Sequence, residues 1–495
     1  MRSTVVNGKT SVDLPGIGAG PAARRAARPA VLRPAAGGAA PRQPKMVMRH
    51  GKLVRADAPR IRDDQPTTIA DTASDHDALP AAKPLGGFAK ASIVMMVLSI
   101  LIPNVAYLGS VKLTAYTLLL VLAFPWAFVT WLSGTSIKRL LPDYLMLGFT
   151  IWAALALTVN AGMLPIETVG LHFVQTFGAY LIGRLLIRDM RSMQLFVITA
   201  AIASILLLPF VVYEAATGTQ VLLRFAGMAG QAHGDLDLGT RNGIHRSQGI
   251  FEHPILMGVF SAGLLSLFVY GMDGRSRLLR WLSIVAAPVS AVCSMSTAAL
   301  LSLNVQFGLM LWGRLFRTVK KHWTILTCLL ITLYVIVDLL STKTPFHVFV
   351  NYATFSAQSS YNRILIWQFG TAEVARHPIF GIGMGEWERP RYMSDSMDNF
   401  WLVQAVRFGL PGLMLLLGSF YVILKRISRL HGPTVEIDHL RRGVIFSVLA
   451  TMITIFSVHL WNASYVWLML VLGATTWLTM PVGTAAADDP HLQKT

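Results

Sequence analysis

Cysteine and charged residues are both scarce in this sequence. Only 2 of its 495 residues are cysteine and 14% are charged, whereas charged residues make up about 25% of an average soluble domain. Two cysteines, Cys293 and Cys328, are too few for a disulfide framework or a cysteine zinc site. The shortage of charge excludes an ordinary soluble domain of this length.

A nucleic-acid-binding motif is also absent, although the formal net charge is +18. Lysine and arginine gather in short loops between apolar blocks, which is the positive-inside bias of membrane proteins. We therefore expect no nucleic-acid partner. A short apolar core with a cleavage site does not follow the early arginines, so the sequence predicts no secretory signal.

Hydrophobic residues, by contrast, are abundant. They make up 54% of the chain and occur in blocks of about the 20 residues that a helix needs to cross a bilayer. The pattern predicts an all-α polytopic membrane protein with twelve transmembrane helices. The expected spans are 91–110, 113–133, 144–160, 168–187, 195–213, 254–271, 279–294, 297–314, 323–341, 399–424, 443–460 and 463–481.

Composition divides the chain into three regions. Residues 1–88 are rich in Ala, Pro, Gly and Arg and nearly free of aromatic residues. Such a segment cannot bury enough apolar surface to offset its ordering entropy, so we predict a disordered basic tail, solvated or touching anionic lipid headgroups. Residues 89–482 form the predicted transmembrane domain, and residues 483–495 form a short second tail.

The basic loops set the expected orientation. If the spans alternate, one side of the membrane receives all the loops that carry most of the lysine and arginine, namely 136–143, 188–194, 273–280, 314–321 and 425–442. That side is expected to be cytoplasmic and to receive both termini. Two long loops, 214–253 and 342–398, then lie on the far side.

Arginines in the two long loops are the first candidates for chemistry. Guanidinium binds phosphate through paired hydrogen bonds and stays charged at any working pH. Arg246 and Arg363 lie near the points where the loops should rejoin the helices, so together they could hold a diphosphate. Arg224 and Arg241 are further candidates for substrate binding. Each arginine could instead anchor to lipid phosphates or form a loop salt bridge.

A carboxylate, Asp398, directly precedes a predicted span and could accept a proton from a reacting hydroxyl. Alternatively, Asp398 or Asn399 caps the helix that follows, and both roles are compatible. His253 and His377 are rival bases, but each precedes a proline, which favours a structural turn. His253, Tyr361, His377 and Asn399 are also expected to contribute to substrate binding.

Five glycines surround this carboxylate in the sequence. Gly381, Gly383 and Gly385 resemble a phosphate-cradling loop, although no preceding strand or Walker lysine accompanies them. A tight re-entrant turn at the membrane surface explains them equally well. Gly409 and Gly412 are typical of positions where helices approach closely.

The spacing Asn399, nine residues, Gly409, two residues, Gly412 resembles a motif of the O-antigen ligase and Wzy-type polysaccharide polymerase superfamily of bacterial inner-membrane proteins. Ligases of that family carry His followed by Asn, Ser or Gln, nine residues and Gly-x-x-Gly after a large periplasmic loop. Asp398 stands where the family has this histidine, which leaves room for a polymerase.

Other segments resemble the same family. They are the loop arginine in Arg363-x-x-x-Trp367, the turn His377-Pro378-x-x-Gly381-x-Gly383, and the loop-entry segment Arg246 with Gly249-x-Phe251-x-His253-Pro254. The motifs lie in residues 195–424, and the twelve-span layout agrees over residues 91–481.

The resemblance implies a metal-independent membrane glycosyltransferase without a cofactor. Its donor would be a glycan on undecaprenyl diphosphate at the periplasmic face, with the diphosphate held by arginines and the acceptor hydroxyl activated or oriented by Asp398. The expected reaction is polymerisation of lipid-linked repeat units into exopolysaccharide or O-antigen. The alternatives are an O-antigen ligase acting on lipid A core or another acceptor, and a polysaccharide-related membrane transporter. Expected partners are the lipid bilayer and other polysaccharide assembly proteins.

Overall fold

The computed structural model describes residues 46–49, 52–55 and 85–480, apart from short gaps at 110, 135–136, 164, 233–238, 242, 342–343, 346, 349–356, 431 and 433. Two compact units divide the chain after residue 82. In the first, strands β1 (Met46–Arg49) and β2 (Lys52–Arg55) pair in antiparallel fashion. The rest of the predicted disordered tail up to residue 84, and the tail 483–495, lie outside the described residues.

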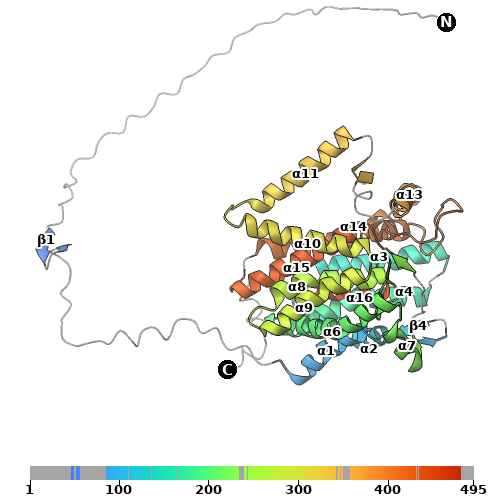
Figure 1. The fold of residues 1–495 in the computed structure, drawn as a ribbon, viewed down its shortest axis with the longest axis horizontal. Helices are drawn as coiled ribbons and strands as arrows, with labels where there is room; N and C mark the ends of the chain where they lie inside the picture. Colours follow the sequence, from blue (N-terminus) through green and yellow to red (C-terminus); the bar gives the residue numbers. More distant parts are fainter. Residues whose placement is uncertain are drawn as a thin grey trace, which may run out of the picture. The chain divides into compact units, whose positions relative to one another are not determined.

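The second unit is a bundle of helices (Figure 1). Its α-helices are α1 (Gly87–Ile100), α2 (Ala115–Ser133), α3 (Leu141–Ala161), α4 (Ile166–Phe173), α5 (Ala179–Leu186), α6 (Met190–Thr217), α7 (Val221–Met228), α8 (Pro254–Gly271), α9 (Arg277–Cys293), α10 (Thr297–Leu315), α11 (His322–Leu340), α13 (Ala357–Arg376), α14 (Phe400–Arg429), α15 (Val435–Thr454) and α16 (Asn462–Ala474). A π-helical turn, η1 (Val174–Gly178), joins α4 to α5, and a 3₁₀ turn, η2 (Thr476–Thr479), follows α16.

Six helices in the described part of the chain are long and apolar enough to cross a membrane, namely α2, α3, α6, α8, α11 and α14. The mainly helical, polytopic character is therefore confirmed, while the count of twelve spans stays a prediction. The centre of the bundle lies around α16, in which every residue from Ala463 to Ala474 is buried. Gly473 permits its close crossing with α5, because a Cβ there would lie 1.8 Å from the carbonyl oxygen of Tyr180.

The first predicted span, 91–110, is wrong beyond residue 100. Helix α1 ends at Ile100, and strands β3 (Asn104–Leu108) and β4 (Val111–Thr114) form an antiparallel hairpin after it. Pro103 has no N–H for a continuing helix, and Gly109 supplies the positive φ of 65° in the hairpin turn. Strand β5 (Gln231–Ala232) adds to β3, so the all-α prediction misses a small sheet.

The two long predicted loops contain structure of their own. The helix α6 runs to Thr217 and therefore past the expected loop start at 214. The first loop then holds α7, β5 and a two-stranded ribbon of β6 (Thr240–Arg241) and β7 (Ile244–His245). The second loop contains α13. The apolar pattern does not show these elements, because α7 and the strands are short and α13, although 20 residues long, is too polar to be recognised as a span.

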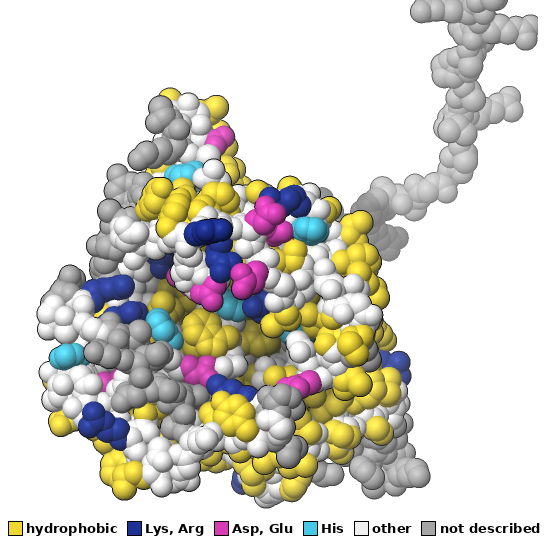
Figure 2. Space-filling model, turned by 90° about the vertical axis from the view of Figure 1, so that its right-hand side faces the viewer, with side chains coloured by type: hydrophobic (Ala, Val, Ile, Leu, Met, Phe, Trp, Pro, Cys, Tyr) yellow, Lys and Arg dark blue, Asp and Glu magenta, His cyan; other side chains and the backbone are white. Residues whose placement is uncertain are grey.

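Both long loops lie at one end of the bundle, which we call the loop end. Asn104 donates from its side chain to the Ala226 carbonyl at 2.9 Å, and Asn160 donates to the Phe380 carbonyl at 3.3 Å. The first contact joins β3 to the first loop and the second joins α3 to the second loop. Figure 2 shows a hollow at this end. Hydrophobic side chains line its floor, and basic, acidic and histidine side chains surround it.

The basic loops meet at the opposite end, which we call the basic end. Arg275 donates to the side-chain oxygen of Gln194, and Asp273 forms an ion pair with His439. These contacts join three of the five basic loops, as the alternation of spans predicts. The cytoplasmic orientation of this end stays a prediction.

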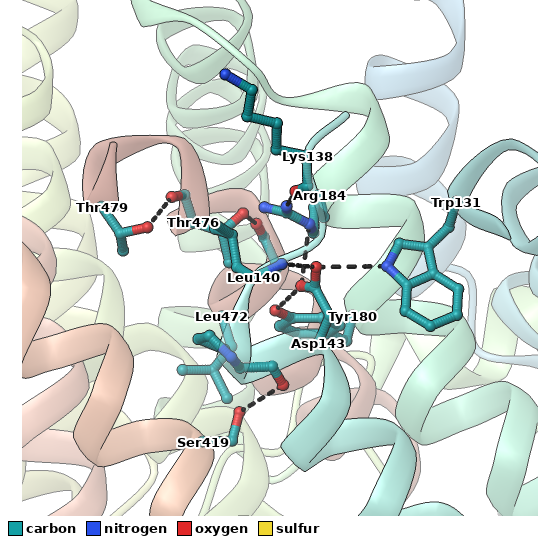
Figure 3. Close-up of polar contacts among 12 residues, drawn as sticks. Trp131, Lys138, Leu140, Asp143, Tyr180, Arg184, Ser419, Leu472, Thr476 and Thr479 are labelled. Carbon is teal, nitrogen blue, oxygen red and sulfur yellow. Dashed lines mark hydrogen bonds and ion pairs between the residues drawn. The ribbon is translucent and has the colours of Figure 1, made fainter. Parts of the chain in front are cut away.

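A buried ion pair lies at the basic end (Figure 3). Arg184 Nε lies 3.0 Å from Asp143 Oδ1, and neither side chain is more than 1% exposed. The Tyr180 hydroxyl donates to the same carboxylate at 2.7 Å. The Leu140 backbone N–H also donates to this carboxylate, at 2.8 Å. Since Arg184 also donates to the Lys138 carbonyl, this pair locks α5 against the start of α3.

At the loop end, α14 is broken at Gly409, whose φ of 71° and ψ of 179° are open essentially only to glycine. The turn 378–383 binds the backbone at this break. The Ile382 N–H donates to the Val406 carbonyl at 2.8 Å, and the Gly383 N–H donates to the Arg407 carbonyl at 3.0 Å. In the other direction, the Leu410 N–H donates to the Pro378 carbonyl at 2.8 Å. The glycine-rich segment is therefore a turn that docks on a broken helix.

We expect Gly409→Ala to destabilise the protein by several kcal/mol, because its Cβ would lie 2.0 Å from the Ile379 carbonyl oxygen in a backbone region that alanine avoids. Thermal unfolding of the reconstituted protein measures this effect. Gly308→Ala on α10 is the matched control, since its Cβ meets nothing within 4 Å and alanine favours a helix. Equal melting temperatures for the two variants would contradict the account of the break.

Asp143→Ala should cost roughly 3–5 kcal/mol, because it leaves Arg184 as an uncompensated buried charge. The double variant Asp143→Leu, Arg184→Met should recover much of that loss, since it removes both charges. Chemical unfolding of the single and double variants checks this expectation. A single variant as stable as the parent would show that the pair does not hold α5 against α3.

Candidate functional site

Arg246 lies at the loop end, directly before a segment (247–249) that is hydrogen-bonded to α6. The carboxylate of Glu214, at the end of α6, accepts the backbone N–H groups of Gln248 and Gly249 at 2.9 and 3.0 Å. Ser247 donates its hydroxyl to the Val211 carbonyl at 2.7 Å. The Nε of Arg246 is buried and has no hydrogen-bond partner among the described residues. These contacts therefore fix the chain directly after Arg246 and leave its Nε unsatisfied.

Arg363 reaches the same end of the bundle from α13. Its side chain is buried; Nε donates to the Ser457 carbonyl at 3.1 Å and Nη2 donates to the Thr297 hydroxyl at 3.5 Å. Its Nη1 is buried and finds no partner in the part of the chain that the structure describes. Both contacts are to neutral oxygens, so the positive charge of Arg363 is not cancelled by a bonded carboxylate.

Arg241 connects these two arginines. It is anchored by a hydrogen bond from Nη1 to the Met295 carbonyl at 3.0 Å. Burial lowers the pKa of Arg246 to about 10, and the charge of Arg241 adds to this effect. Burial also lowers the pKa of Arg363; nearby Asp398 opposes the shift and Arg241 reinforces it. Arg241, Arg246, Arg363 and Asp398 therefore share one electrostatic neighbourhood.

His253 belongs to the same neighbourhood. Burial, and then the charges of Arg246 and Arg241, lower its pKa to about 4, so it is neutral at pH 7. Its Nδ1 accepts the Ile255 backbone N–H at 3.1 Å and caps α8, which leaves the proton of the neutral ring on Nε2. We call Arg241, Arg246, His253, Arg363 and Asp398 the basic cluster.

Asp398 and Asn399 divide the two roles expected of them. Asn399 is the residue that caps α14: it is buried, and its side-chain oxygen accepts the Leu402 N–H at 3.1 Å. Asp398 is half-buried and accepts a hydrogen bond from the Ser396 hydroxyl at 3.0 Å. The cap therefore does not use the carboxylate of Asp398, which acts on Arg363 instead.

A row of rings extends from the basic cluster along the loop end. The ring of Trp461 lies 6.1 Å from that of His253 and 6.0 Å from that of His459, and His459 stacks on Phe400 at 5.9 Å. Trp461 is half-buried. Such flat faces beside charged groups are suited to holding a polar organic ligand.

His459 and Arg407 lie at this site and were not in the predicted site set. The buried Nδ1 of His459 has no hydrogen-bond partner among the described residues, and the charge of Arg407 acts on this ring. The charge of Arg407 also reaches His172 on α4. The sequence signal for His459 and Arg407 is that each is an ionisable residue inside an apolar block. Several residues of this kind occur in the chain, and the sequence does not show which of them lie close together in the fold.

Three predicted site residues lie apart from the basic cluster. Arg224 is exposed on α7 and Tyr361 is exposed on α13. His377 is about half exposed and faces Glu373 at 3.5 Å, in a network at the C-terminal end of α13. The structure therefore brings together Arg241, Arg246, His253, Arg363 and Asp398, with Asn399 adjacent, but not these three.

The glycine-rich turn offers no phosphate cradle through Gly383, because its N–H is bonded to α14. Cβ atoms at Gly381 and Gly409 would lie 2.3 and 2.0 Å from carbonyl oxygens across the contact. Among the described residues, no three His, Cys, Asp or Glu side chains gather as metal ligands would. Metal-independent chemistry stays a prediction.

Residues 281–417 match the model of a family described as O-antigen ligase. The match runs from α9 into α14 and includes Arg363, Asp398, Arg407 and Gly409. The resemblance to the O-antigen ligase and polysaccharide polymerase superfamily is thereby confirmed. No curated protein matches the chain.

The neutral state of His253 makes stability depend on pH. Its pKa is about 4 in the folded protein and 6.5 ordinarily, so its contribution is complete above pH 6.5 and is lost as the pH falls towards 4. We expect a loss of roughly 2–3 kcal/mol over this range. His253→Asn keeps the helix cap. It should reduce the fall in melting temperature that the parent protein shows between pH 7 and pH 4.5. An unchanged pH slope in this variant would contradict the assignment.

Proposed function

Because the chain carries an O-antigen ligase family domain over residues 281–417, we propose that it polymerises oligosaccharide repeat units linked to undecaprenyl diphosphate. The reaction would take place at the periplasmic face of a bacterial inner membrane and extend an exopolysaccharide or O-antigen. The observation that carries this proposal is the basic cluster, in which Arg246 and Arg363 each keep a buried guanidinium nitrogen without a partner among the described residues.

The diphosphate of the donor would bind between these arginines. Guanidinium groups held in a low dielectric stabilise a phosphate charge strongly, because water does not compete for them. The neutral Nε2–H of His253 adds an uncharged donor at the same place. Since Arg363 is fixed by the Ser457 carbonyl and the Thr297 hydroxyl before the ligand arrives, it needs little reorganisation when charge develops on the leaving diphosphate.

Sugar transfer then needs one proton acceptor. The acceptor hydroxyl attacks the anomeric carbon of the donor, the bond from that carbon to the diphosphate oxygen breaks, and the diphosphate leaves with the bonding electrons. The hydroxyl proton passes to Asp398, whose carboxylate lies in the basic cluster and is not used as the helix cap. Half-buried Trp461 supplies a ring face on which a sugar can stack.

An O-antigen ligase is the second candidate, because the matching family is described by that activity. Both reactions transfer a glycan from the same diphosphate carrier to a hydroxyl. They differ in the acceptor, which is a second lipid-linked repeat unit for a polymerase and lipid A core for a ligase. Asp398, in place of the histidine found in ligases of the family, favours the polymerase.

Arg363→Ala should lower the rate of chain extension by about 100-fold or more, because it removes a fixed cation from the leaving diphosphate. The assay uses full-length protein in proteoliposomes with lipid-linked repeat units, and gel electrophoresis resolves the glycan ladder. Arg363→Lys should rescue little, since an ammonium group cannot reproduce the fork of donors. Normal ladders from Arg363→Ala would remove the basic cluster from the mechanism.

Arg277→Ala is the control for this experiment, because Arg277 is an exposed arginine at the basic end. Its activity should equal that of the parent. The melting temperature of each variant separates a loss of chemistry from a loss of folding. A product that forms only when lipid A core is added, with no ladder from repeat units alone, would select the ligase.

A further inference from the structure

A second cleft lies at the C-terminal end of α13. It encloses about 680 Å³ between α13 and the segment 386–393, within the range of roughly 300–1,000 Å³ typical of small-molecule sites. Half of its lining residues are charged, namely Arg376, Glu386, Glu388, Arg389 and Arg391, and the other half are apolar.

One cation in this cleft is fixed before any ligand binds. Trp387 is buried and donates its indole N–H to the Asp395 carbonyl at 3.1 Å. The Arg389 guanidinium lies 5.6 Å from the centre of this indole ring and donates to the Trp387 carbonyl at 3.2 Å. The side chain of Arg389 is only 16% exposed, so its orientation is set by the indole.

The carboxylates of the cleft are held differently. Buried Glu373 accepts the Glu388 backbone N–H at 2.9 Å and pairs with Arg376 at 2.5 Å, which fixes the wall of the cleft. The side chains of Glu386 and Glu388 are 89% and 77% exposed. Their oxygens are therefore accessible acceptors for the hydroxyl groups of a ligand.

Ion pairs with carboxylates engage two of the three arginines in the lining. Arg376 pairs with Glu388 at 2.7 Å and Arg389 with Glu386 at 3.6 Å. Arg391 is exposed and forms no ion pair or hydrogen bond with any described residue. With buried Glu373 included, three arginines stand beside three carboxylates, and Arg391 is the arginine whose charge a ligand can reach. The lining therefore suits a ligand with many hydroxyl groups and a negative group placed beside Arg391.

We propose that this cleft binds an acidic saccharide unit, such as a uronic acid, of the glycan on which the enzyme acts. Arg391 pairs with the carboxylate of the sugar, Arg389 donates to its oxygens, and Glu386 and Glu388 accept its hydroxyl groups. The inference rests on the proposed glycan-transfer function and adds the class of sugar that is recognised.

The cleft is separate from the basic cluster. Arg363 and Arg376 are thirteen residues apart on α13, which places their backbones about 20 Å apart at about 1.5 Å per residue. A glycan whose diphosphate lies in the basic cluster, or a second glycan presenting its hydroxyl there, can extend along α13 to the cleft. Recognition of the sugar and chemistry at the diphosphate would therefore lie about 20 Å apart along one helix.

Binding of a lipid-free probe tests the cleft without requiring transfer. Full-length protein in nanodiscs is titrated with trigalacturonate and with maltotriose, an uncharged trisaccharide of the same α-1,4 linkage, by isothermal titration calorimetry. Arg391→Gln should weaken trigalacturonate binding roughly tenfold, as the loss of a charge-assisted hydrogen bond would give. Arg317→Gln, an exposed arginine before α11, is the matched control and should bind as the parent does.

Trigalacturonate binding that is equal in Arg391→Gln and the parent, or absent from the parent, would overturn the proposal. Maltotriose binding as tightly as trigalacturonate would also overturn it. Loss of binding in Arg391→Gln alone would support it. Inhibition of the transfer assay by trigalacturonate, competitive against the donor or against the acceptor, identifies which glycan occupies the cleft. The Arg363→Ala ladder assay tests the transfer function separately, so the two failures are distinguishable.

Discussion

The contact between the turn 378–383 and the broken helix α14 is the constraint on which the loop end depends. Backbone atoms touch there without intervening side chains, because a Cβ at Gly381 or Gly409 would collide with carbonyl oxygens. The break frees the carbonyls of Val406 and Arg407, and the turn supplies their donors. This contact fixes the short first half of α14, which carries Asp398 just before its start and Arg407 near its end. It thereby sets the place of both groups relative to α13.

The basic cluster lowers the stability of the folded protein. Buried cations are unfavourable unless they are paired, and like charges close together add repulsion. In the part of the chain that the structure describes, Arg363 and Arg241 are held by neutral oxygens, and Asp398 is the carboxylate that acts on Arg363. His253 stays neutral at pH 7 and so adds no further charge. An anionic ligand would relieve this excess, which is the physical reason to expect one.

The sequence predicts the helices well and the site in part. Long apolar blocks locate helices such as α8 at residues 254–271, because burial in lipid imposes length and hydrophobicity. The hairpin after α1 differs from the predicted span, although Pro103, Asn104 and Gly109 within and beside it are signals of a turn. Arg246, Arg363 and Asp398 could be named from loop position alone. The contributions of Arg407 and His459 depend on tertiary contacts between α14 and the turn before α16, which no local pattern encodes.

Arginine has opposite roles at the two ends of the bundle, and its partner decides which. At the basic end, Arg184 and Arg280 are paired with Asp143 and Asp273 at 3.0 and 2.6 Å, so their charges are cancelled within the protein. At the loop end, Arg363 is bonded to a carbonyl and a hydroxyl, which fix its orientation but leave its charge. Since residue type and burial are the same for Arg184 and Arg363, composition cannot separate a structural arginine from a binding one. The charge of the hydrogen-bond partner separates these two arginines, and it leaves the positive charge of Arg363 available to a ligand.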